Sequence, residues 1–110
     1  MADKFTIELT ILAENQILKI SQYIRDEFKS PLSADRFIDK IEGEISKLDT
    51  NPDRIVLVEK EPWRSRGLHK YVIGNYIVYF IIVEHDKIVR VMAVVPYKMD
   101  QEKQLKKIDL

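Results

Sequence analysis

Three short runs of β-branched and aromatic residues between positions 67 and 97 constrain the fold of this chain more than any other feature. Gly74-Asn75 separates the first run from the second, and His85-Asp86-Lys87 separates the second from the third. Short turns rich in Gly, Asn and Asp join antiparallel neighbours, so the stretch predicts a three-strand meander. The middle run, residues 76–83, is almost wholly apolar, which indicates a strand buried on both faces.

The first fifty residues predict a cover for this sheet. Residues 5–11 alternate apolar and polar side chains, which is typical of a half-buried strand. Two stretches with helical spacing of apolar residues follow, and Ser30-Pro31 ends the first and begins the second. Asn51-Pro52 ends the second helix, so the two form an antiparallel hairpin. The side chains expected to pack on the sheet are Ile17, Ile20, Ile24, Phe28, Phe37, Ile41, Ile45 and Leu48.

The remaining segments are shorter. Residues 55–58 suit a short strand, residues 59–66 a polar loop, and the lysine-rich tail at 98–108 a short helix. Helices that gather on one face of a sheet define an α+β domain. The sequence therefore predicts one domain over residues 1–110, with an N-terminal strand and an antiparallel helical hairpin packed on one face of an antiparallel sheet.

Composition excludes several function classes. The chain has no cysteine, which rules out disulfides and thiolate chemistry. Its 18 basic residues balance its 18 acidic ones, so the whole molecule lacks the charge of a nucleic-acid binder. Residues 1–50 carry a net charge of −3 and residues 51–110 a net charge of +3. No run reaches the roughly 18 apolar residues that a membrane helix needs, and a cytoplasmic location fits this composition.

Familiar enzyme motifs are missing as well. The sequence has no Gly-rich phosphate loop, no histidine pair at metal-ligand spacing and no Gly-x-Ser-x-Gly elbow, so we expect neither a cofactor nor a metal. His85 falls in a turn, where a solvated side chain is expected.

One set of polar residues suggests a phosphodiester site. Its members flank the meander: Arg64, Arg66, His69 and Lys70 lie near the start of the first strand, and Tyr97 and Lys98 follow the last. If these groups converge at one end of the sheet, the cations can stabilise a phosphorane while His69 or Tyr97 moves protons. The alternative is a scattered basic rim.

The order and spacing of several short motifs resemble the RelE/ParE superfamily of bacterial toxins, and the ParE-like branch most. The resemblance covers nearly the whole chain, although no single motif is specific. The residues that carry it are Tyr23-Ile24, Ala34, Phe37-Ile38, Lys40-Ile41, Leu48, Asn51-Pro52, Gly67, Lys70, Gly74-Asn75-Tyr76, Val78-Tyr79-Phe80, Arg90-Val91, Asp100 and Leu105.

This resemblance implies a toxin of a type II toxin–antitoxin system, of the kind that also stabilises plasmids, held inactive by a cognate antitoxin. RelE-like members cut mRNA on the ribosome, whereas ParE-like members poison DNA gyrase without hydrolytic chemistry. RelE-like nucleases usually carry an arginine early in the strand where this chain has Tyr76 or Ile77. We therefore predict a growth inhibitor that binds a gyrase-like target. The alternatives are a ribosome-dependent endoribonuclease and a decayed toxin that only binds its antitoxin. Trp63 and Tyr71 are the predicted antitoxin anchors, because aromatic residues dominate such interfaces.

Overall fold

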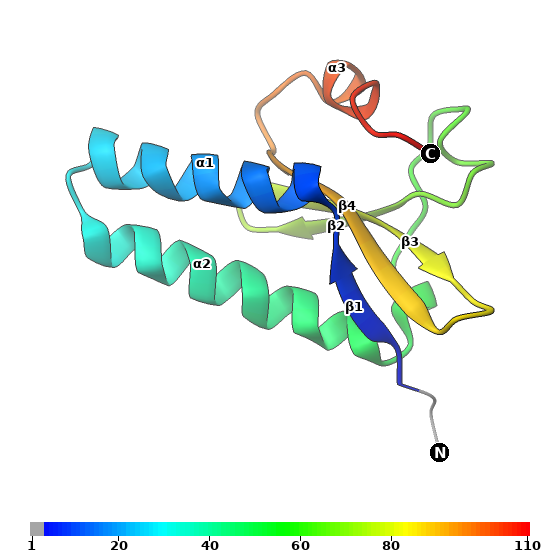
Figure 1. The fold of residues 1–110 in the computed structure, drawn as a ribbon. Coiled ribbons are helices and arrows are strands. Elements are labelled where there is room, and N and C mark those ends of the chain that lie inside the picture. Colours follow the sequence, from blue (N-terminus) through cyan, green and yellow to red (C-terminus); the bar gives the residue numbers. More distant parts are fainter. Residues whose placement is uncertain (1–3) are drawn as a thin grey trace.

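A computed structural model of the chain describes residues 4–110 as two long helices beside a four-stranded sheet (Figure 1). A short third helix lies near the C-terminus, on the other side of the sheet from the hairpin. The elements are β1 (Thr6–Leu9), α1 (Ile11–Glu27), α2 (Pro31–Ser46), 3-10 turns at Lys47–Asp49 and Pro52–Arg54, β2 (His69–Ile73), β3 (Tyr76–Val83), β4 (Ile88–Pro96) and α3 (Gln101–Leu105).

Side-chain caps start both long helices. The Thr10 hydroxyl accepts a 3.1 Å hydrogen bond from the Ala13 amide, and the Ser30 hydroxyl accepts one of 3.2 Å from the Ser33 amide. Each bond satisfies an amide that the first helical turn leaves without an intrahelical partner. Pro31 occupies the first turn of α2, where a missing amide costs nothing. The predicted boundary at Ser30-Pro31 is confirmed.

The sheet has the strand order β1-β4-β3-β2, and its last three strands form the predicted meander. Gly74, at φ +57°, occupies the first position of the two-residue turn between β2 and β3, a conformation that favours glycine. The N-terminal strand departs from the prediction, because β1 pairs parallel to β4 and makes the sheet mixed rather than antiparallel. The two strands can pair in parallel because the connection between them is long: it contains the helical hairpin, β2 and β3.

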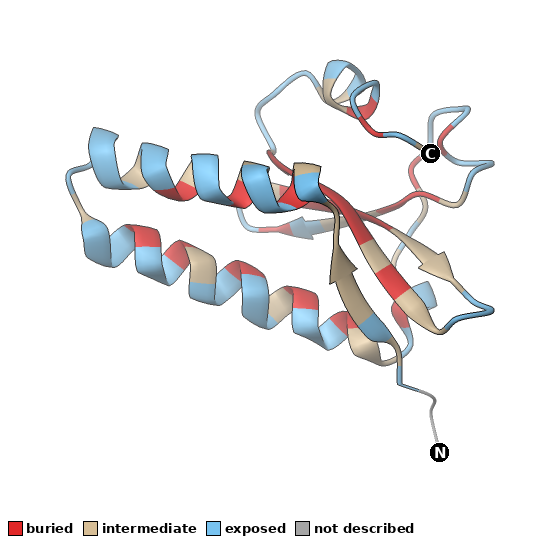
Figure 2. Ribbon diagram, viewed as in Figure 1, coloured by how far each residue is buried: buried red, intermediate tan, exposed pale blue. Residues whose placement is uncertain are grey.

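The helix-covered face holds the first half of the core (Figure 2). On this face the apolar side chains that were predicted to pack from the two helices lie against alternate residues of the strands. Phe28 is the exception: it is the C-cap of α1 and is 67% exposed, so its predicted packing on the sheet is wrong. The residues of this core are Ala13, Ile17, Phe37, Ile41, Ile45, Leu48, Ile73, Val78, Phe80, Val89, Val91 and Val94.

The opposite face of the sheet is also covered, as the apolar middle strand predicts. The loop before β2 supplies Val58, Trp63 and Leu68, and the C-terminal segment supplies Leu105 and Ile108. These side chains pack on Ile77, Tyr79, Met92, Ala93 and Val95. Residues 55–58 do not form the predicted short strand; they contribute one bridge, between Leu57 and His69. The expected C-terminal helix is confirmed as α3.

Candidate functional site

His69, the predicted acid or base, is a core residue. Its ring stacks on Phe80 with centroids 4.9 Å apart and planes within 8°. Its Nδ1 lies 2.8 Å from the carbonyl oxygen of Ile55, and the side chain is among the buried polar groups. A ring held between a backbone carbonyl and an aromatic face lies out of reach of a polymeric substrate.

Tyr97 and Lys98 lie at the other end of the sheet from His69. In the strand register His69 faces Phe80, whereas Pro96, which precedes Tyr97, faces Tyr76. Four residues of β3 separate those two positions, about 13 Å at the usual rise per residue. The expected convergence is therefore wrong. The first and third strands of a meander run in the same direction, so the start of one lies beside the start of the other and not beside its end.

The predicted cations are also dispersed. Arg66 borders a depression near the C-terminus that it shares with Arg90, Lys107 and Asp109. Lys70 borders a different depression, whose rim includes the carboxylates of Glu59, Asp100 and Glu102. Arg64 is exposed, and its guanidinium donates to the carbonyl of Val58 across 3.4 Å. The linings of these two depressions include neither His69 nor Tyr97.

The two predicted antitoxin anchors have structural roles in the free chain. Trp63 is buried in the core on the face opposite the hairpin, where it is 9% exposed. Tyr71 is half-buried on the helix-covered face, and its hydroxyl donates a 2.9 Å hydrogen bond to a carboxylate oxygen of Glu44. That bond, followed by the ammonium group of Lys47, lowers the pKa of Glu44. Burial and the Glu44 carboxylate raise the pKa of Tyr71.

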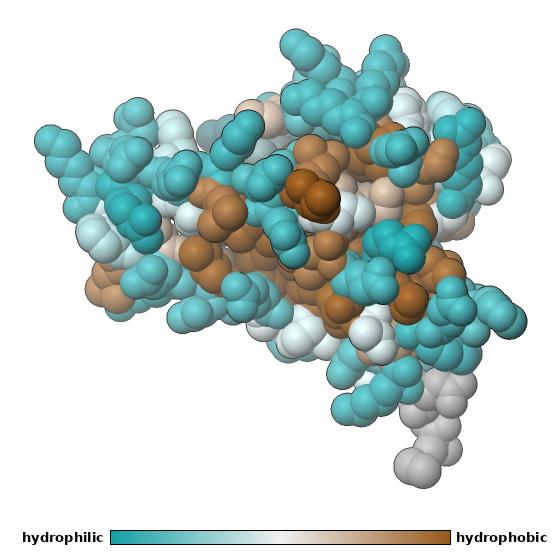
Figure 3. Space-filling view, in the orientation of Figure 1, coloured by the Kyte–Doolittle hydropathy of each residue, from teal (hydrophilic) through white to brown (hydrophobic). Residues whose placement is uncertain are grey.

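Two grooves flank α1. The first, which we call the α1–α2 groove, is an apolar depression of about 530 Å³ between the two helices and β1 (Figure 3). Glu14 and Glu42 are its charged residues. Its apolar lining consists of Ile7, Leu9, Ile17, Leu18, Ile38 and Ile45.

An open strand edge runs beside the α1–α2 groove. The Thr6 amide donates to the carbonyl of Lys87, just before β4, and the amide of Thr10, just after β1, donates to the carbonyl of Val91 in β4. Alternate amides along β1 therefore face β4. The Phe5 amide points the other way and donates to the carbonyl of Asp49 across 2.8 Å. The backbone amides of Ile7 and Leu9 point in the same outward direction as that of Phe5. β1 is the edge strand of the sheet, so no further strand covers this side. An extended partner segment can therefore hydrogen-bond to this edge.

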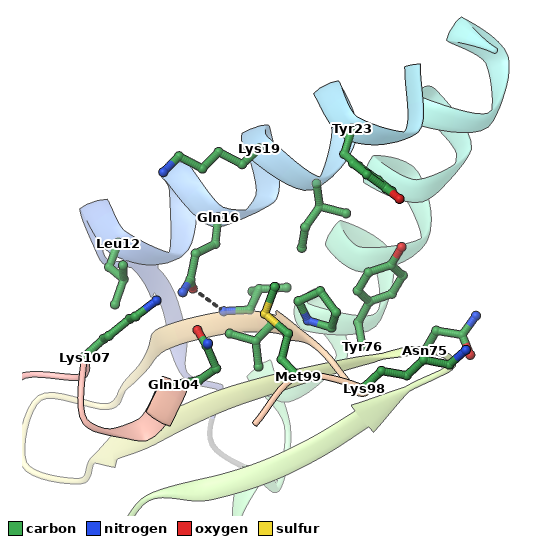
Figure 4. Close-up of a pocket in the computed structure, with 14 residues that line it drawn as sticks. Leu12, Gln16, Lys19, Tyr23, Asn75, Tyr76, Lys98, Met99, Gln104 and Lys107 are labelled. Carbon is green, nitrogen blue, oxygen red and sulfur yellow. Dashed lines mark hydrogen bonds between the residues drawn. The ribbon is translucent and has the colours of Figure 1, made fainter. Parts of the chain in front are cut away.

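The second groove, which we call the basic groove, lies between α1, the end of β4 and α3 and has a volume of about 760 Å³ (Figure 4). Apolar and aromatic side chains form its floor and walls, and three lysines line it. In residues 4–110 no aspartate or glutamate lines it. Its lining includes Leu12, Gln16, Lys19, Ile20, Tyr23, Tyr76, Pro96, Lys98, Met99 and Lys107.

Sequence reasoning missed the exposed apolar residues of α1. Leu18 is 54% exposed and Tyr23 is 60% exposed, on opposite flanks of the buried stripe. Their signal was present: α1 has more apolar residues than one stripe needs, because Leu12, Leu18 and Tyr23 fall outside the spacing that packs on the sheet. Large apolar side chains left at both flanks of a helix indicate surfaces for partners.

Neither a membrane span nor a metal cluster is found in the part of the chain that the structure describes. No helix within residues 4–110 is long and apolar enough to cross a membrane. The same residues contain no group of three or more His, Cys, Asp or Glu side chains placed to hold a metal ion.

Comparison with known proteins gives one family match and several structural neighbours. The family model described as the ParE toxin of the type II toxin–antitoxin system parDE matches residues 7–101. Among curated proteins, none is significantly similar to the chain in sequence.

The structural neighbours share the fold at low sequence identity. The chromosomal ParDE system of Pseudomonas aeruginosa aligns with a TM-score of 0.71 at 12% identity, over 86% of this chain and 98% of that one. The RelBE2 toxin–antitoxin complex of Mycobacterium tuberculosis gives 0.62 at 16% identity, over 86% and 92%. A doubly substituted RelE toxin of E. coli in the free state gives 0.60 at 14% identity, over 99% and 100%.

Proposed function

The chain belongs to the ParE family of toxins from type II toxin–antitoxin systems, and on that premise we propose that it inhibits growth in the cytoplasm by binding its target rather than by cutting RNA. DNA gyrase is the target to test first, because the ParE-like branch that the sequence resembles acts on gyrase. A cognate antitoxin neutralises the toxin by covering an apolar groove.

The observation that carries the proposal is the separation of His69 from Tyr97 and Lys98. Attack of a ribose 2′-hydroxyl on the adjacent phosphate needs a proton acceptor, a proton donor and fixed positive charge around one phosphate. Here the imidazole is stacked in the core at one end of the sheet, and the other two groups lie about four strand residues away.

The face of the sheet opposite the helical hairpin, which we call the second face, is also covered, and this supports the same conclusion. Loop and C-terminal side chains fill it with an apolar core that contains Trp63, Tyr79 and Leu105. An RNA strand on this face would have to displace that core, which would expose apolar surface to water. Arg66 and Lys70 border two separate depressions, and the lining of each depression includes at least one carboxylate.

The α1–α2 groove is the surface that we assign to the antitoxin. Its apolar lining suits the side chains of a partner segment, and the open edge of β1 suits that segment's backbone. Glu14 and Glu42 at the rim favour basic residues in the partner. This assignment replaces Trp63 and Tyr71 as the proposed anchors with aliphatic contacts such as Leu18.

A supercoiling assay with purified gyrase tests the proposal. Inhibition should grow with the ratio of toxin to gyrase and should level off near equimolar amounts, because a binder acts stoichiometrically. Premixing the toxin with its antitoxin should restore supercoiling. Unchanged supercoiling at a large molar excess of folded toxin would remove gyrase as the target.

A further inference from the structure

The proposed function assigns no ligand to the depression that Arg66 borders, which we call the arginine depression. Its volume of about 700 Å³ is within the usual range of small-ligand sites. The start of α1, the loop before β2 and the segment after α3 meet there, and Figure 1 shows that loop beside the C-terminal end. Its lining consists of Thr10, Leu12, Arg66, Ile81, Arg90, Met92, Lys107, Asp109 and Leu110.

Three cations line the arginine depression, against one side-chain carboxylate, that of Asp109. Arg66 and Lys107 are exposed, and neither side chain makes an ion pair or a hydrogen bond with any of residues 4–110. Arg90 has one partner, because its Nη2 lies 3.4 Å from a carboxylate oxygen of Glu8. A guanidinium carries five N–H donors, so this contact orients Arg90 and leaves donors for a ligand.

The backbone holds each cation in place around the depression. Arg90 lies within β4, between two neighbouring strands. Arg66 belongs to the loop that Trp63 anchors in the core of the second face, and Lys107 precedes Ile108, which is buried in the same core. Fixed attachment points reduce the entropy that is lost when side chains close around an anion.

Phosphate is the anion that these cations match best. A guanidinium can donate two parallel hydrogen bonds to phosphate oxygens, and a phosphate monoester offers three such oxygens to several cations at once. The floor of the depression is apolar, with Ile81 and Met92, so a base or a sugar attached to the phosphate can lie on it. Of residues 4–110, no histidine or tyrosine lines the depression, which suits binding rather than cutting.

We propose that the arginine depression binds a nucleotide unit through its phosphate, with Arg66 and Arg90 as the main contacts. A free nucleotide and a nucleic-acid strand share this chemistry, and the experiment below distinguishes them. The inference goes beyond the proposed function and does not depend on it. Because the 18 basic and 18 acidic residues of the chain balance, the rest of the molecule adds no attraction, and we expect a dissociation constant of about 0.1 mM.

Fluorescence anisotropy with the purified full chain tests the proposal. The probe is a short, labelled DNA single strand, and its matched control is the same strand with a neutral methylphosphonate backbone. The charged strand should bind at least about tenfold more tightly than the neutral one. Equal binding of the two strands, or no binding of the charged strand at millimolar protein, would contradict the proposal.

Unlabelled competitors identify the source of the phosphate. Displacement of the probe by deoxyadenosine monophosphate as readily as by the unlabelled strand assigns the depression to a free nucleotide, and displacement by the strand alone assigns it to nucleic acid. A polyglutamate peptide should compete at least about tenfold less well than the strand, because it lacks phosphate. Equal competition by that peptide would contradict phosphate recognition.

Variants of the loop before β2 locate the binding. Arg66→Glu should weaken the strand about tenfold or more. Its matched control is Arg64→Glu, an exposed position of the same loop outside the lining, which should stay within about twofold. Arg66→Lys keeps the charge but loses the planar fork, so it should weaken binding about threefold or more.

Equal losses in Arg64→Glu and Arg66→Glu, with thermal melts that show both folded, would place binding outside the depression. Wild-type affinity in Arg66→Lys would show that only charge is recognised and would contradict the assignment to phosphate. Gyrase is absent from these measurements, so a toxin that fails to inhibit supercoiling would defeat the proposed function and leave this inference intact.

Discussion

The hydroxyl of Tyr79 donates a 2.7 Å hydrogen bond to the side-chain oxygen of Gln101, which ties α3 to the middle strand of the sheet. The side-chain Nε2 of Gln101 in turn donates to the backbone carbonyls of Pro96, Tyr97 and Met99 at 2.8–3.1 Å. One glutamine therefore holds the turn after β4 and the start of α3 against the sheet. This contact keeps the second face closed and helps to form the wall of the basic groove.

Replacing Tyr79 with Phe should destabilise the protein by about 1 kcal/mol, the usual net contribution of a hydrogen bond of this kind. The ring is retained, so the apolar packing of this side chain on the second face is preserved. Urea unfolding at neutral pH measures the difference in the free energy of unfolding. A variant as stable as the wild type would mean that Gln101 does not depend on this hydroxyl.

The same variant gives a prediction for alkaline pH. Burial raises the pKa of Tyr79 to about 12, from 10 in the unfolded chain. Between those values the unfolded state loses its proton before the folded state does, so this contribution to stability is complete below pH 10 and is lost as the pH rises to about 12. The Tyr79→Phe variant should therefore lose less stability over this range. Tyr71 and Tyr76, whose pKa values burial also raises, are present in both proteins.

Replacing Ile41 with Ala should cost about 2–4 kcal/mol, because the side chain is 1% exposed in the core between the hairpin and the sheet. Leu32→Ala is the matched control on the same helix, where the side chain is 58% exposed and the expected change stays within about 0.5 kcal/mol. Denaturant unfolding of the two variants compares them directly. Similar losses would show that α2 does not pack on the sheet as described.

Trp63 should fluoresce as a buried indole in the free protein, because it is 9% exposed. Its emission should also stay unchanged when the antitoxin binds, since neither groove beside α1 includes it. As the only tryptophan of the chain, it reports on one position, provided that the antitoxin carries no tryptophan. A shift of several nanometres on complex formation would restore Trp63 as an anchor and move the partner to the second face.

Leu18→Asp should block neutralisation by the antitoxin while leaving the toxin folded. The side chain lines the α1–α2 groove and is 54% exposed, so a charge there disturbs a partner more than the core. Coexpression of toxin and antitoxin, followed by growth, measures the escape from neutralisation. Asn15→Asp, an exposed position on the same helix that lines neither groove, is the matched control. Full neutralisation of the Leu18→Asp toxin would exclude this groove as the antitoxin surface.

Local patterns predicted the local structure well. Ser30 and Pro31 correctly indicated the start of α2, and Gly74 indicated the hairpin turn. Such signals are reliable because caps and turns depend on residues adjacent in sequence. The parallel pairing of β1 with β4 could not be predicted in this way. It joins residues 82 positions apart, such as Thr6 and Ile88, and no short motif records such a pairing.

The predicted convergence of the candidate site residues is wrong for a geometric reason and not for a chemical one. His69, Tyr97 and Lys98 are suitable residue types, but strand direction separates them. Periodicity also could not show that His69 faces the helices and stacks on Phe80, because burial of a polar side chain depends on the partners that the fold brings to it. The exposed apolar residues on the flanks of α1 could have been predicted from the sequence, because Leu18 and Tyr23 fall outside the spacing that packs on the sheet.

Mapping RNA ends on translating ribosomes, after expression of the toxin without its antitoxin, tests the central claim most directly. We predict growth inhibition without new cleavage sites in the ribosomal A site. We also predict that His69→Ala acts mainly through stability, because the ring is part of the core. Abundant A-site cleavage that disappears when Tyr97 or Lys98 is replaced with Ala, in variants that remain folded, would contradict the account and identify the protein as a nuclease.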